Sequence, residues 1–106
     1  MMTATPRQAG NVYWHRELPP LDADPAGEYT VEATSGRVSD PFLDRDAIWR
    51  ECYGGLITET GRRVQQEIAR LGGRYARIVD ESIDVKHDDA TSEAWLHGRF
   101  TYRLYT

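Results

Sequence analysis

The segments YARIVDESIDV (residues 75–85) and LHGRFTYRL (residues 96–104) decide the fold. Each alternates apolar with polar residues, and a period of two indicates a strand with one buried face. The odd positions of the first segment hold Tyr75, Val79, Ile83 and Val85, and the even positions of the second hold Leu96, Phe100, Tyr102 and Leu104. An antiparallel hairpin that places odd positions opposite even ones unites both sets on one face.

A turn at residues 88–91 sets the register of this hairpin, with Val79 opposite Phe100 and Ile83 opposite Leu96. We therefore expect Phe100 to face the core. The reverse face then holds polar cross-strand pairs, which stabilise a sheet by about 0.2–1 kcal/mol each. These pairs are Asp80 with Arg99, Ser82 with His97, Asp84 with Trp95, and Ala76 with Arg103.

Another strand and a helix precede the hairpin. Residues 29–34 alternate with a period of two and are rich in β-branched side chains, which indicates a strand. Asp40 and Pro41 favour a helix start, as N-cap and first helical residue. Gly54 and Gly55 predict a break. Beyond it, a helical stripe of Ile57, Val64, Ile68 and Leu71 leads to a C-terminal cap at residues 72–73.

The order strand, helix, strand, strand (β-α-β-β) predicts an α+β fold. We expect an antiparallel sheet of about three strands, with one face covered by a broken helix. Residues 1–27, which include Pro19, Pro20 and Pro25, predict an N-terminal arm, and residues 28–106 a single domain. Tyr13 and Trp14 in the arm should dock on the body of the fold or on a neighbouring subunit.

Composition limits the function classes. The 106 residues carry a formal net charge of −4, which disfavours a nucleic-acid partner. The single cysteine, Cys52, fits a reducing compartment, and no run approaches the roughly 18 apolar residues of a membrane span or resembles a signal peptide. We therefore expect a cytoplasmic, bacterial-type protein with no membrane partner.

The reverse face of the hairpin is the first candidate site. Exposing a large apolar ring such as that of Trp95 to water is unfavourable, so we expect something to cover it. The candidates are the arm with Tyr13 and Trp14, another subunit, or an aromatic ligand. Trp95, His97, Arg99 and Tyr105 make up this predicted ligand or subunit surface.

A metal site is the alternative. His87, Asp88 and Asp89 lie together at the hairpin tip, and His97 lies on the adjacent strand. This set could hold a divalent ion, although its spacing matches no zinc pattern. We otherwise expect no cofactor.

An enzymatic and a phosphate-binding interpretation have less support than the two candidate sites above. Cys52 could act as a nucleophile with a histidine as base, but a lone buried cysteine is more often a small core residue. Arginines at positions 62, 63, 70, 74 and 77 could contact phosphate, although interspersed acidic residues favour a solvated helix face.

The chain resembles two families. The chain looks like the YbjQ-type family, labelled heavy-metal-binding, in three segments. These are a strand at residues 27–38, a helix end at 68–73 followed directly by YARIV (75–79), and a strand ending GRFTY (98–102). The strand-helix-strand-strand order and the closing FTYRL (100–104) are similar to dodecins, small flavin-binding shells. Either resemblance implies a ring or shell of identical subunits joined through their sheets, with no catalytic residues.

Together these features predict a small non-enzymatic protein. We expect it to form a homo-oligomer through its sheet and to bind a small or aromatic ligand at the subunit boundary.

Overall fold

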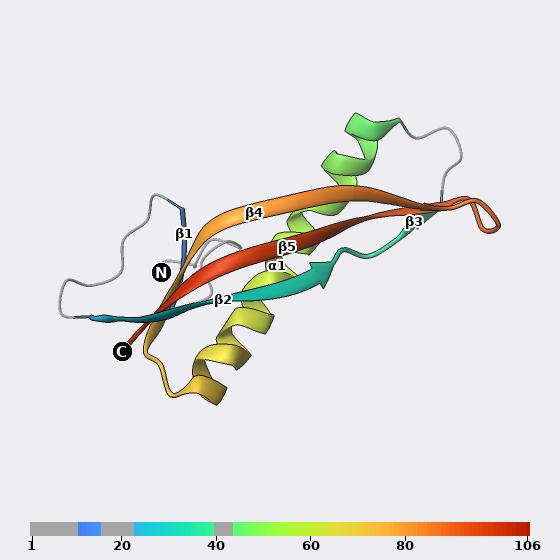
Figure 1. The fold of residues 1–106 in the computed structure, drawn as a ribbon. Helices are drawn as coiled ribbons and strands as arrows, with labels where there is room; N and C mark the ends of the chain where they lie inside the picture. Colours follow the sequence, from blue (N-terminus) through green and yellow to red (C-terminus); the bar gives the residue numbers. More distant parts are fainter. Residues whose placement is uncertain (1–10, 16–22, 40–43) are drawn as a thin grey trace, which may run out of the picture.

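A computed structural model describes residues 11–15, 23–39 and 44–106, and its fold is α+β (Figure 1). One helix, α1 (Arg45–Leu71), runs obliquely across one face of a mostly antiparallel sheet. The strands are β1 (Val12–Trp14), β2 (Pro25–Thr34), β3 (Val38–Ser39), β4 (Tyr75–Asp88) and β5 (Glu93–Tyr105). The predicted class is confirmed, but the expected count of about three strands is wrong because five are present.

The strand order is β1-β4-β5-β2, and β3 pairs with β5 beyond the end of β2. Among the described strands, only β1 is parallel to its neighbour, and the other pairs are antiparallel. The last strand, β5, is therefore central and touches β4, β2 and β3. Among the described residues, no helix is long and apolar enough to cross a membrane.

Part of the predicted arm belongs to the sheet. Val12 and Trp14 in β1 are buried, and the Trp14 ring meets Phe100 edge-on at 5.9 Å between ring centroids. At the end of β1, His15 donates its backbone N–H to the Ile78 carbonyl, and its Nε2 lies 2.5 Å from Glu81 Oε1. Docking of Trp14 on the body of the fold is thus confirmed.

Helix α1 is continuous, so the predicted break at Gly54 and Gly55 is wrong. Both glycines face solvent, while Cys52 and Leu56 on either side are buried in the core, which offsets the local cost of glycine. Asp44 is the N-cap and accepts a hydrogen bond from the Ala47 N–H at 2.8 Å. The cap predicted at residues 40–41 lies outside the described residues.

The predicted end of the helix is confirmed. Gly72 adopts the left-handed conformation, with φ of 75°, that ends many helices and that glycine tolerates best. The predicted apolar stripe also faces the sheet: Ile57, Val64 and Ile68 are buried, and Leu71 is partly buried against the same core.

The continuous helix leads to a stability prediction. Replacing Gly54 and Gly55 together by alanine should raise the free energy of unfolding by about 2 kcal/mol, because each glycine costs about 1 kcal/mol relative to alanine within a helix. No atom lies within 4 Å of a Cβ added at either position. Urea denaturation followed by circular dichroism measures the change, and the melting temperature should rise by roughly 10 °C.

Gly98→Ala provides a contrasting control, because its added Cβ would overlap the Phe100 ring and meet Leu56 at 3.3 Å. It should destabilise the protein by about 1–3 kcal/mol. A destabilised Gly54/Gly55 double variant would contradict the continuous helix.

The hairpin register differs from the prediction. A bulge between Ile78 and Asp80 inserts Val79 into β4. Before the bulge Ile78 pairs with Tyr102, and beyond it Ile83 pairs with Gly98, not with Leu96. The predicted pairs of the reverse face are likewise wrong: Asp80 lies opposite Thr101, Ser82 opposite Arg99, Asp84 opposite His97, and Ala76 opposite Leu104. The turn is one reason: Asp88 pairs with Glu93, so the turn is formed by residues 89–92, and the strands between turn and bulge pair two residues away from the expected register. The bulge is the other reason, because its extra residue exchanges the two faces of β4 before Val79.

Candidate binding surface on the outer face of the sheet

The candidate site lies on the sheet face opposite α1, which we call the outer face. Cross-strand partners in an antiparallel sheet share a face, so the register identifies its members. They include Glu28, Thr30, Glu32 and Thr34 of β2, Arg77, Asp80, Ser82, Asp84 and Lys86 of β4, and Trp95, His97, Arg99, Thr101 and Arg103 of β5. Phe100 is fully buried on the other face and Trp95 is partly exposed, which confirms the predicted orientation of β5.

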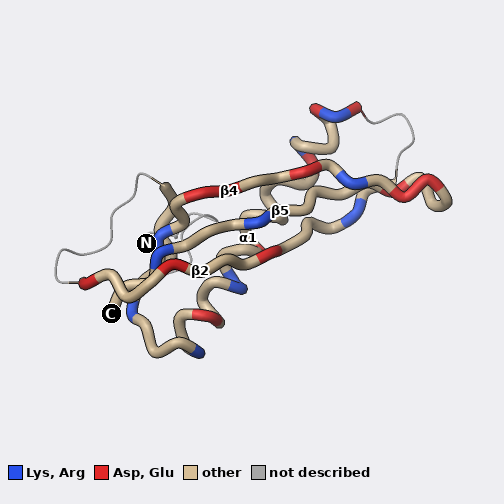
Figure 2. The backbone as a smooth tube through the Cα atoms, viewed as in Figure 1, with Lys and Arg blue, Asp and Glu red and all other residues tan. Residues whose placement is uncertain are grey.

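Charges on the outer face follow the strands. Figure 2 shows acidic residues on β2 beside basic residues on the central β5, while β4 carries both signs. Arg103 binds Glu28 with two hydrogen bonds, of 3.0 and 2.6 Å. One Glu32 oxygen lies 2.8 Å from Nε2 of His97, and the other lies 3.6 Å from Arg99. These side chains are partly exposed, so each pair contributes at most about 1 kcal/mol.

A hollow of about 260 Å³ opens on this face over β2, β5 and β4. It is lined by Glu32, Ser82, Asp84, Lys86, His97 and Arg99. Two of the predicted surface residues, His97 and Arg99, are thus brought together. The lining offers hydrogen-bond donors and acceptors of both charge signs, which suits a small polar group better than an aromatic one.

Trp95 is covered from within the chain. The Arg37 guanidinium lies 3.9 Å from the centroid of the Trp95 ring, and the same side chain bonds to Glu93 at 3.1 Å. Such a cation–π contact contributes about 0.5–1 kcal/mol at an exposed site. The expected cover by the N-terminal arm is wrong for Trp14, which packs in the core on the other side of the sheet.

Tyr105 does not present its ring to a partner. It is only 8% exposed, at the end of β5, where its neighbours in the register are Tyr75 and Pro25. The prediction of Tyr105 as a surface residue is wrong because β2 begins at Pro25, within the predicted arm, and continues the sheet beside it.

The structure does not assemble the predicted metal site. His87 pairs with Ala94, which faces the helix side, whereas His97 pairs with Asp84 on the outer face. At the tip, Asp88 Oδ1 accepts the Ala90 N–H instead. The described residues include His87, Asp88, Asp89 and His97, and among them no three histidine, cysteine or carboxylate side chains are grouped to hold a metal ion.

Cys52 lies on the helix side of the sheet and is buried at 3% exposure. Its Sγ lies 3.7 Å from the Gly36 carbonyl. His97, by contrast, faces the outer side and pairs with Glu32. This placement gives Cys52 the role of a small core residue that also contacts the segment between β2 and β3.

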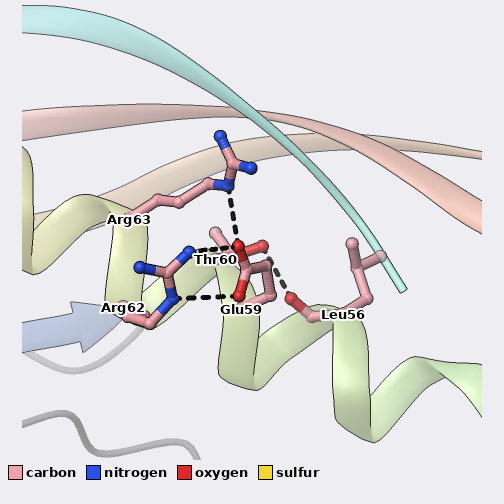
Figure 3. Close-up of polar contacts among 5 residues, drawn as sticks. All are labelled: Leu56, Glu59, Thr60, Arg62 and Arg63. Atoms are coloured by element: carbon pink, nitrogen blue, oxygen red, sulfur yellow. Dashed lines mark hydrogen bonds and ion pairs between the residues drawn. The ribbon is translucent and has the colours of Figure 1, made fainter. Parts of the chain in front are cut away.

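The helix arginines pair with carboxylates. Figure 3 shows Arg62 and Arg63 converging on Glu59, one turn earlier in α1. Hydrogen bonds from Arg62, and then from Arg63, lower the pKa of Glu59 to about 2. Arg70 likewise bonds to Glu67. These contacts fit the solvated helix face rather than a phosphate site.

Comparison with known proteins gives no further guide: no family model, curated protein or solved structure matches the chain. Function is therefore inferred from the geometry of the outer face. Sequence patterns missed Glu32 and Lys86 in the lining of the hollow, and Arg37 beside Trp95. Glu32 could have been found from the alternation in residues 29–34, once β2 was paired with β5, whereas no pattern marks Arg37 as the partner of Trp95.

Proposed function

We propose that this protein is a small non-enzymatic module that self-associates through its sheet. The observation that carries the proposal is the one-sided cover of the sheet. Helix α1 packs on one face, and in the described ranges no second layer lies on the other. Two-layer folds bury a sheet face against another element, so an uncovered face is available to a partner.

The charge pattern favours a second copy as that partner. Glu28 and Glu32 on β2 lie beside Arg103 and Arg99 on β5, so the basic strand of one copy has a complementary acidic strand in the other. The carboxylates of Glu28, Glu32 and Asp84 lie among the arginines and disfavour a polyanion as the partner. The resemblances to YbjQ-type proteins and dodecins remain predictions, and both also imply subunits joined through sheets.

A cytoplasmic location belongs to this proposal and is supported by the unpaired Cys52. The hollow supports binding of a small polar ligand as an accompanying function, since its lining combines Lys86 and Arg99 with Asp84 and Glu32. Arg37 occupies one face of the Trp95 ring, which speaks against an aromatic ligand stacked there.

Sedimentation equilibrium tests self-association. The wild-type protein should form oligomers in the micromolar range, typical of a modest interface. Trp95→Ala should weaken association about tenfold, because tryptophan is among the side chains that contribute most at interfaces.

Tyr29→Ala is the matched control. Tyr29 is an exposed aromatic residue on the helix side of β2, stacked on Tyr102 at 5.8 Å, and its loss should leave association unchanged. A strict monomer at all concentrations would contradict the proposal.

A further inference from the structure

We infer that two copies join through β4, whose edges pair antiparallel about a two-fold axis at Val85, so that two sheets become one. This inference rests on the proposed self-association and adds an edge contact, with its register, to the contact through the outer face that Trp95→Ala tests. It is carried by three features of β4: an open edge, the direction of its backbone groups, and the order of its charges.

Within the described residues, the edge of β4 is unpaired over most of its length. β1 pairs with β4 only from Ala76 to Ile78. Beyond the bulge, no strand within the described ranges lies on this side of residues 79–88. These residues include neither proline nor glycine. An uninterrupted open edge is a template for a further strand, and a second copy supplies an identical one.

Backbone directions along this edge follow from the hydrogen bonds of β5. The Leu96 carbonyl accepts the Ser35 N–H on the β2 side. The backbone N–H and C=O groups of successive residues point to opposite sides of a strand, so those of the odd-numbered residues of β5 point toward β4. Their partners Asp84 and Lys86 therefore bond to β5. The intervening residues Ile83, Val85 and His87 direct their N–H and C=O groups to the open edge.

A two-fold axis at Val85 places acidic residues of one copy opposite basic residues of the other. It places Asp84 opposite Lys86 of the second copy and Lys86 opposite its Asp84, which gives two ion pairs on the outer face. On the helix side, Val85 meets Val85 of the second copy, and Ile83 meets its His87. Opposite charges and β-branched pairs both stabilise cross-strand neighbours.

Neighbouring registers are less favourable. An axis at Asp84 opposes two aspartates, and an axis at Lys86 opposes two lysines. An axis at Ile83 sets Glu81, which contacts His15, opposite Val85. Like charges directly opposite one another destabilise a sheet. Among these four registers, the axis at Val85 combines edge-directed backbone groups with opposite charges on the outer face and β-branched residues on the helix side.

The pairing also connects the two hollows. Ser82, Asp84 and Lys86 form the β4 side of each hollow. In the joined sheet, these residues from both copies stand on adjacent strands. The hollows then form one trough across the subunit boundary.

Proline substitution tests the edge. Val85→Pro removes an edge-directed N–H and leaves the β4–β5 hydrogen bonds intact, as proline at a sheet edge does. We expect its dimer dissociation constant in sedimentation equilibrium to rise more than tenfold. Thr30→Pro is the matched control, because Thr30 directs its N–H to the opposite edge, on β2, and this variant should associate like the wild type. Circular dichroism confirms that both variants are folded.

Charge exchange tests the register and does not depend on whether a proline variant folds. Lys86→Asp, which opposes two aspartates, should weaken association about tenfold. Adding Asp84→Lys restores opposite charges and should restore association. For the same axis, Val85→Cys should form a disulfide-linked dimer on mild oxidation, since paired Cα atoms lie about 5.5 Å apart. Ile83→Cys should not.

The outcomes separate the two proposals. If the wild type associates but Val85→Pro and Lys86→Asp associate equally well, the β4 contact is wrong and self-association stands. If Lys86→Asp weakens association and the double variant does not restore it, the register at Val85 is wrong. A wild type that remains monomeric overturns both proposals.

Discussion

Replacing Phe100 by alanine should lower the free energy of unfolding by about 3–5 kcal/mol, the range for truncating a large buried aromatic side chain. Phe100 is fully buried on the helix side of the central strand. Its ring meets Trp14 edge-on and lies, with Leu56, against Gly98. Urea denaturation measures the loss, which is a large fraction of the 5–15 kcal/mol that stabilises a typical domain.

Thr101→Ala is the control for Phe100. Thr101 is the next residue of β5 and points to the outer face, so its truncation should cost at most about 1 kcal/mol. Equal losses for the two variants would show that the faces of β5 are not assigned correctly.

The second large effect concerns β1. Trp14→Ala should also lower the free energy of unfolding by about 3–5 kcal/mol, because Trp14 is 3% exposed and fills the core beside Phe100. Chemical denaturation measures the change, with Tyr13→Ala as the matched control. Tyr13 is partly exposed, and its ring lies 6.0 Å from that of Tyr75, so its loss should cost less. An unchanged stability of Trp14→Ala would mean that β1 is a detachable arm.

The orientation of β5 could be predicted because its apolar residues alternate without interruption from Leu96 to Leu104. Once Phe100 faces the helix, Trp95, His97 and Arg99 must face outward. The register with β4 differs from the prediction because the turn is formed by residues 89–92 and not 88–91, and because the bulge at Val79 exchanges the two faces of that strand. The signal of the bulge is a change of parity at residues 78–79, from apolar Ala76 and Ile78 at even positions to Ile83 and Val85 at odd ones.

The remaining differences arise from tertiary contacts. Gly54 and Gly55 indicate a break when considered locally, yet burial of Cys52 and Leu56 on either side keeps α1 continuous. The prediction that Tyr105 belongs to the candidate surface is wrong because Pro25, its partner in β2, helps to bury it. The sequence around Pro25 shows no apolar alternation that would predict a strand there. The proposed metal site failed because strand pairing sends His87 and His97 to opposite faces.

The central position of β5 has a consequence for biosynthesis. β5 is made after β1, β2, β3, α1 and β4, yet it is the strand against which β4, β2 and β3 all pair. While it is still in the ribosomal tunnel, β2 has no partner strand and α1 has no surface on which to bury its apolar stripe. Contacts between residues far apart in sequence slow folding, so the nascent chain should remain unstructured, and dependent on chaperones, until β5 emerges.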